Sequence, residues 1–135
     1  MIGVGLLVLR LVLGVIFIGH GAQKLFGSFG GPGISGFAKM LEQLGLKPAR
    51  FMAILAGLAE FVGGILMILG LLTPLAALAL IGVMIVAVLS VHLRNGFFNT
   101  NGGYEFNLAL LGMALTLLIV GAGTYSLDSM LGILW

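Results

Sequence analysis

Charged residues are scarce in this sequence. Six Lys or Arg and four Asp or Glu make up 7% of the 135 residues, whereas an ordinary globular domain carries about 25% charged residues. Hydrophobic residues account for 61% of the chain. A chain with so few charges cannot cover a folded surface in water, so a soluble fold, a disordered chain and a charged coiled coil are all excluded. We expect an integral membrane protein with one domain, residues 1–135.

Cysteine is absent. This absence excludes disulfides, thiolate catalysis, cysteine-ligated zinc and iron–sulfur clusters, and we expect no metal site. Basic runs are also lacking, so nucleic-acid binding is set aside. The first residues carry no basic segment, and Arg10 interrupts the apolar run, so no cleavable signal is expected. Residues 31–36 fit the pattern GxGxxG, but they follow a membrane helix rather than a strand, which argues against dinucleotide binding.

Four apolar runs are long enough for membrane helices, which need about 20 mostly apolar residues. They cover residues 3–26, 51–72, 75–93 and 106–120, without the period-two alternation of strands. The sequence therefore predicts an all-α fold, a membrane-embedded antiparallel four-helix bundle. Thr73 is the expected N-cap of the third span, with Pro74 at its first position.

Two shorter segments have an amphipathic pattern. Phe37, Met40, Leu41 and Leu44 recur at the i, i+3, i+4, i+7 spacing of one helix face, with polar residues opposite. This pattern predicts a short helix on the membrane surface within the first loop. An amphipathic tail, residues 126–135, follows the fourth span.

Basic residues are distributed unevenly across the expected bundle. The first and third loops, with the helix ends beside them, hold Lys24, Lys39, Lys47, Arg50 and Arg94, and the opposite side has no basic loop residue. By the positive-inside rule these loops face the cytoplasm and both termini lie outside. The expected location is the bacterial inner membrane or a plasma membrane, in contact with lipid.

Ionisable residues inside apolar spans are costly and are candidates for function. On the first span Arg10, Phe17, His20 and Lys24 share one helix face with two glycines. Glu60 shares its face with small residues, so it should face protein rather than lipid. At about 1.5 Å per residue, Arg10 and Glu60 both lie near the midplane, which predicts an ion pair between them.

The remaining ionisable residues lie nearer the cytoplasmic side. His20, His92 and Glu105 are expected there, so these groups predict a polar pocket that narrows inward from the cytoplasm. Other interpretations remain open. Arg10 could snorkel toward water, the charges could serve helix packing alone, and a buried histidine could simply be hydrogen-bonded. Two histidines on different helices also allow a haem site, although His20 and His92 differ in expected depth.

Several motifs occur in order along nearly the whole chain. They are Arg10-x-x-Leu13-Gly14, His20-Gly21-x-x-Lys24-Leu25-Phe26-Gly27, Leu44-Gly45-Leu46-x-Pro48, Gly57-Leu58-Ala59-Glu60-x-x-Gly63-Gly64, Gly70-Leu71-x-Thr73, Val91-His92, Gly102-Gly103-Tyr104-Glu105-x-Asn107 and Tyr125-Ser126-Leu127-Asp128. In these motifs the sequence resembles the DoxX family of small membrane proteins. Many members have a basic residue after the threonine, where this chain has Pro74. The resemblance implies a four-helix membrane bundle associated with quinone-linked oxidoreductases.

The leading functional hypothesis is an enzyme or subunit of quinone-linked redox chemistry. A quinone headgroup needs an apolar slot, hydrogen-bond donors and a proton route. We expect catalytic roles for His20, Glu60, His92 and Glu105. The expected binding residues are Arg10, Lys24, Phe17 and Tyr104. Two other classes stay open: a non-catalytic anchor or assembly subunit, and a transporter of protons or a small solute. A partner subunit or a homo-oligomer is compatible with all three.

Overall fold

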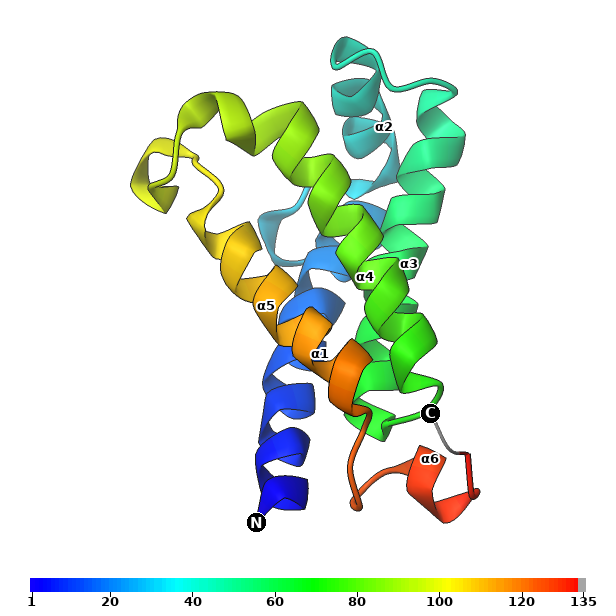
Figure 1. The fold of residues 1–135 in the computed structure, drawn as a ribbon. Coiled ribbons are helices and arrows are strands. Elements are labelled where there is room, and N and C mark those ends of the chain that lie inside the picture. Colours follow the sequence, from blue (N-terminus) through cyan, green and yellow to red (C-terminus); the bar gives the residue numbers. More distant parts are fainter. Residues whose placement is uncertain (134–135) are drawn as a thin grey trace.

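The computed structural model describes residues 1–133, and within that range every regular element is helical, which confirms the all-α prediction (Figure 1). The α-helices are α1 (Ile2–Phe26), α2 (Gly33–Gln43), α3 (Ala49–Leu69), α4 (Thr73–Ala87), α5 (Glu105–Val120) and α6 (Leu127–Met130). A π-helical turn, Val88–His92, extends α4, and short 3-10 turns occupy Ser28–Gly30, Leu93–Asn95 and Asn99–Asn101. The last two residues of the expected amphipathic tail, 134–135, lie outside the described range.

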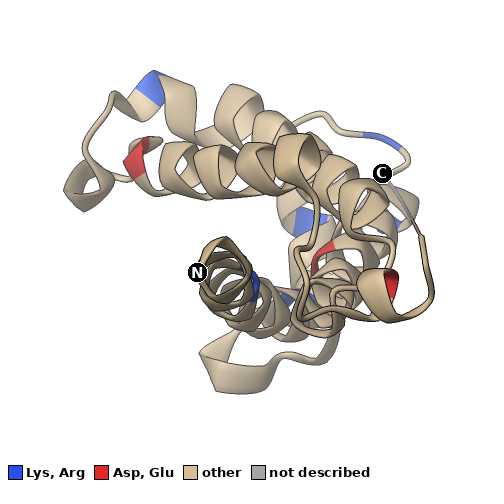
Figure 2. Cartoon of the chain, turned by 60° about the horizontal axis from the view of Figure 1, so that its bottom comes forward, with Lys and Arg blue, Asp and Glu red and all other residues tan. Residues whose placement is uncertain are grey.

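Three helical stretches are long and apolar enough to cross a membrane: Ile2–Phe26, Ala49–Leu69 and Thr73–Asn95. They match three of the four expected spans. The fourth, α5, has 16 residues and a length of about 24 Å, somewhat less than the bilayer core of about 30 Å. Charged positions are few along the ribbon (Figure 2), as the composition requires of a chain in lipid.

The short helix in the first loop is real but begins earlier than expected. The α2 helix starts at Gly33, and its apolar residues Phe37 and Leu41 are buried against Ala53 of α3. This face therefore packs on protein. The opposite face carries Lys39 and Glu42, both exposed. The predicted helix is therefore confirmed, while its position on the membrane surface stays a prediction.

Glycines bring α1 and α3 into backbone contact. A Cβ atom at Gly14 would lie 2.7 Å from the Gly64 carbonyl oxygen, and one at Gly21 would lie 2.6 Å from the Phe61 amide nitrogen. Only residues without a side chain allow so close an approach, which is typical of helix pairs in membranes. These contacts fix the register of α1 against α3.

The α4 and α5 helices form a second packed pair. Leu80 and Met84 of α4 are buried with Leu110, Ala114 and Leu117 of α5 in one core cluster. In Figure 1 this pair lies close to α1 and α3 near the chain termini and diverges from them toward α2 and the loop after α4. The two helix pairs therefore enclose a wedge of space on the loop side, whose contents are described below.

The glycine contacts can be tested with two alanines on the same helix. Gly21→Ala should destabilise the protein by about 1–3 kcal/mol, because the new methyl group meets the α3 backbone. Gly19→Ala is the matched control, since a Cβ there has no neighbour within 4 Å. Thermal melts in mild detergent measure both. Equal melting temperatures for the two variants would contradict the close packing of α1 on α3.

Candidate functional site

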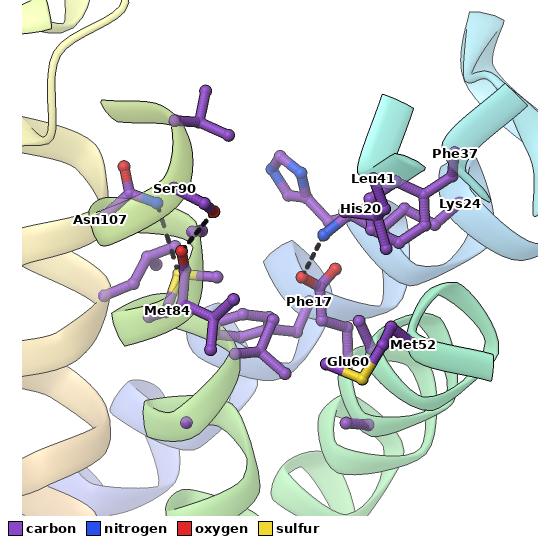
Figure 3. A pocket seen from close by; sticks show the side chains of 18 of the residues that line it. Phe17, His20, Lys24, Phe37, Leu41, Met52, Glu60, Met84, Ser90 and Asn107 are labelled. Carbon is purple, nitrogen blue, oxygen red and sulfur yellow. Dashed lines mark hydrogen bonds and ion pairs between the residues drawn. The ribbon is translucent and has the colours of Figure 1, made fainter. Parts of the chain in front are cut away.

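A cavity of about 780 Å³ lies in the wedge between the two helix pairs (Figure 3). Most of its wall is apolar and comes from α1 to α5. The polar residues on the wall are fewer, and they are His20, Lys24, Glu60, Ser90, His92, Asn99 and Asn107. A mostly apolar cavity of this size with a few polar groups is typical of a small-molecule site.

An ion pair between Lys24 and Glu60 lies on the cavity wall (Figure 3). The Glu60 side chain is completely buried, and the Lys24 side chain is 22% exposed. Lys24 donates from Nζ to Glu60 Oε1 and also lies 4.9 Å from the centre of the Phe37 ring, a cation–π distance. The other carboxylate oxygen, Oε2, is buried and has no hydrogen-bond partner among the described residues.

An unpartnered oxygen of this kind is unusual, because buried polar atoms nearly always find a partner. Glu60 belongs to the cavity wall, and its unpartnered oxygen is buried within that wall. With a proton on Oε2 the group would donate to a ligand carbonyl, and without one it would accept from a hydroxyl.

His20 lies at the border between two hollows. Its ring packs against Phe106 of α5, with ring centres 5.8 Å apart at an angle of 37°. Both residues line the main cavity and also a smaller hollow of about 340 Å³ on the other side, beside Gln23 and Phe29. His20 is exposed rather than buried. Phe17, one helical turn below it and nearly inaccessible, closes the cavity wall at depth.

His92 lies in the π-helical turn that ends α4. Its Nδ1 atom is 2.9 Å from the Gly102 carbonyl oxygen. A carbonyl can only accept, so Nδ1 carries the hydrogen, and in the neutral ring Nε2 remains an acceptor. Single π-helical turns occur frequently at functional sites, where they shift a side chain out of the α-helical register.

Three of the predicted site residues lie outside the cavity wall, namely Arg10, Tyr104 and Glu105. Glu105 accepts a hydrogen bond from the Asn99 backbone amide at 3.1 Å, and the Tyr104 ring packs edge-on against Phe97 with centres 5.5 Å apart. Both contacts hold the loop after α4. Glu105 is bonded to a residue of the cavity wall, Asn99, but neither Glu105 nor Tyr104 belongs to the wall itself, and their roles at the site stay a prediction.

The predicted ion pair between Arg10 and Glu60 is wrong. Arg10 is completely buried, but its guanidinium donates to backbone carbonyls of Met67, Ile68, Ala122 and Tyr125. The register of the two helices explains the difference. Gly21 packs beside Phe61, so Glu60 lies level with the Lys24 end of α1, whereas Arg10 lies about 21 Å from Lys24 along the helix.

Asp128 completes the arrangement around Arg10. Its carboxylate attracts the Arg10 guanidinium and accepts hydrogen bonds from the backbone amides of Leu72 and Thr73, at 2.7 and 3.0 Å. Asp128 therefore caps the start of α4 from far along the chain. The expected capping by Thr73 is wrong, since Leu72 precedes the helix and the Thr73 hydroxyl is buried without a partner.

Sequence reasoning did not single out three further polar residues on the cavity wall, Ser90, Asn99 and Asn107. Asn107 is 6% exposed and donates to the Met84 sulfur at 3.6 Å, and Ser90 donates to the Val86 carbonyl oxygen at 2.5 Å. The available signal was an amide or hydroxyl within an apolar run, which calls for an explanation in the same way as a charge does. Within residues 1–133 no group of three or more His, Asp or Glu side chains is placed to hold a metal ion.

Comparison with known proteins gives the family. The DoxX family model matches residues 5–93, which include α1 to α4 and both members of the Lys24–Glu60 pair. The chain belongs to the DoxX family. This membership agrees with the motifs described above and with the apolar helices of the structure.

Relatives in three bacteria extend the similarity over most of the chain. A membrane protein of Mycobacterium tuberculosis, named as uncharacterized, is 34% identical over 89% of this chain and 77% of its own length. The Bacillus subtilis protein named "Putative oxidoreductase CatD" is 30% identical over 93% of this chain and 85% of its own. The inner membrane protein YqjF of Escherichia coli is 31% identical over 98% and 95%. No solved structure matches the chain.

The ion pair on the cavity wall predicts an asymmetry between its two partners. Lys24→Met should destabilise the protein by about 3–5 kcal/mol, since it leaves a completely buried carboxyl group without a partner. Glu60→Gln should cost less, because the Lys24 side chain is 22% exposed and can extend toward water. The double variant should lose less than the sum of the two single losses. Denaturation in detergent measures all three, and additive losses would contradict the pairing.

Proposed function

We propose that this DoxX protein binds a quinone headgroup in the cavity and serves as the membrane subunit of a quinone-linked oxidoreductase. The observation that supports the proposal is the free oxygen of Glu60, buried on the wall of an apolar cavity beside the Lys24 ammonium. A quinone carbonyl is an acceptor, and its reduced hydroxyl is a donor. The Lys24–Glu60 pair can supply a hydrogen bond to either form.

The other polar groups suit the same ligand. A quinone has two carbonyl oxygens on opposite sides of a flat ring, so a second group must meet the far oxygen. His20 from α1 and His92 from the end of α4 both line the cavity and offer ring nitrogens. Apolar walls, among them Phe17 and Phe106, suit the ring itself.

The redox step needs electrons that this chain does not supply. Reduction of a quinone to a quinol takes up two electrons and two protons, and we assign the electrons to a partner redox subunit. The residues of the cavity would hold the ring: Glu60 would exchange a proton through its unpartnered oxygen, and His92 would accept from a quinol hydroxyl through Nε2. The CatD relative carries the word oxidoreductase in its name, which favours this class over a pure anchor.

The proposal includes the arrangement in the membrane. We infer that α5 crosses the bilayer together with the three longer helices, so that the chain forms a four-helix bundle with loops one and three in the cytoplasm. Five basic residues lie on the side of loops one and three, and the loops of the opposite side have none, which supports this orientation. The cavity, which lies between the helix pairs on the loop side, would then be reached from the cytoplasmic leaflet.

The orientation is tested with reporter fusions. Both termini are expected outside the cytoplasm. A reporter enzyme that works only outside the cytoplasm should therefore be active when it is joined after Trp135, and one that works only in the cytoplasm should be inactive. A second reporter inserted in the loop near Asn99 should give the opposite signal. A cytoplasmic signal from the C-terminal fusion would overturn the orientation and place the cavity in the other leaflet.

Quinone binding is tested by titrating the purified protein with a short-chain quinone. We expect saturable binding to the wild type. Glu60→Gln and His20→Ala should each weaken it by about 1–3 kcal/mol, the cost of leaving a polar partner unpaired. Glu60→Gln keeps the size and shape of the side chain, so its effect reports the carboxyl group itself. The absorption spectrum of the same preparation shows whether the two histidines hold haem instead.

The control variant is Lys39→Ala on the exposed face of α2, which should bind like the wild type. His92→Ala is less direct, because it also removes the bond to Gly102 that holds the loop. Absence of saturable binding to the wild type would overturn the proposal and leave a structural or assembly role as the leading interpretation.

A further inference from the structure

The cavity is long, and exposed residues occur on its wall both at the loop end, where His20 and Asn99 lie, and along α4. On α4 its wall runs from Leu78 through Gly82 and Val86 to Ser90, a distance of about 18 Å along the helix. Leu78 is 52% exposed and Val86 is 43% exposed although both line the cavity, and Leu55 on α3 is 53% exposed. Wall residues with this much exposure lie at a mouth, and in a membrane that mouth faces lipid.

The mouth lies between α3 and α4. Near the Thr73 end the two helices touch, since a Cβ at Gly63 would lie 3.0 Å from Leu80 Cδ2. On the α4 face that lines the cavity, a Cβ at Gly82 has no neighbour within 4 Å. Small residues line both sides of the opening, namely Ala56 and Ala59 on α3 and Ala79 and Gly82 on α4.

The two parts of the cavity differ in chemistry. Its inner part carries the buried Glu60 carboxylate with its free oxygen, and its outer part toward lipid is built from alanine, glycine, leucine and valine side chains. A ligand that fills both parts must have a polar head and an apolar tail. A water-soluble molecule would gain nothing from the outer part, because the hydrophobic effect acts only on apolar surface.

We propose that the ligand is a lipid-borne quinone whose isoprenoid tail leaves the cavity between α3 and α4, past Gly82. The inference rests on the proposed function and adds the route of entry and the residue that controls it. The headgroup reaches Glu60 from within the bilayer, and the absence of a side chain at Gly82 keeps the route open for the tail. Gly82 and Ala79 therefore set a preference for long-tailed over tail-less quinones.

The test compares two quinones with the same ring, one without a tail and one with several isoprene units, on protein in nanodiscs. Gly82→Phe should weaken the long-tailed quinone at least tenfold and change the tail-less one by less than threefold. Gly112→Phe is the matched control. Gly112 also has open space around its Cβ position and is exposed on α5, but it does not line the cavity. The Gly112→Phe variant should bind both quinones with the affinity of the wild type.

The outcomes separate this inference from the proposed function. If the wild type binds neither quinone, both are overturned. The tail route is wrong, and the quinone site stands, if Gly82→Phe leaves the affinity for both quinones unchanged. The same conclusion follows if Gly82→Phe weakens both quinones equally while its melting temperature matches that of Gly112→Phe. Should Gly82→Phe fail to fold, Ala79→Phe on the same wall takes its place with the same expected result.

Discussion

The backbone contact between α1 and α3 is the constraint on which the other features depend. Where Gly14 lies on Gly64 and Gly21 on Phe61, the two helices cannot slide without a clash between main chains. This register brings Lys24 level with Glu60 and leaves Arg10 at the opposite end. Since a buried charge without a partner is strongly unfavourable, the register also decides which partners the charges must find.

Two buried or partly buried cations are neutralised in different ways. Arg10 is saturated by carbonyls from α3 and from the segment after α5, together with the attraction of Asp128, so it holds the chain end against the bundle. Lys24 has one carboxylate partner, and that partner keeps an oxygen free. The first arrangement uses the guanidinium within the chain, whereas the second leaves one carboxylate oxygen without a partner among the described residues.

The cavity exists because the second helix pair does not follow the first along its whole length. The α4 and α5 helices pack on each other through Leu80 and Leu110, and α4 diverges from α3 toward the loop after α4, where α5 still contacts α1 through Phe106 and His20. The π-helical turn at the end of α4 and the bonded loop behind it stabilise the open side. The DoxX chain therefore has a cavity with the Lys24–Glu60 pair on one side and the apolar residues of α4 on another.

The sequence by itself determined the membrane class, the all-α fold, the family and the burial of Glu60 against protein, because hydropathy and intramembrane charges are visible residue by residue. The sequence could not determine which residues pair with the buried charged side chains. Depth counted from helix ends paired Glu60 with Arg10, and only the glycine contacts between two distant helices showed that Lys24 is the partner. Likewise Asp128 caps α4 from 55 residues away along the chain. Helix register and long-range capping depend on which surfaces meet in three dimensions, so the tertiary structure alone decided them.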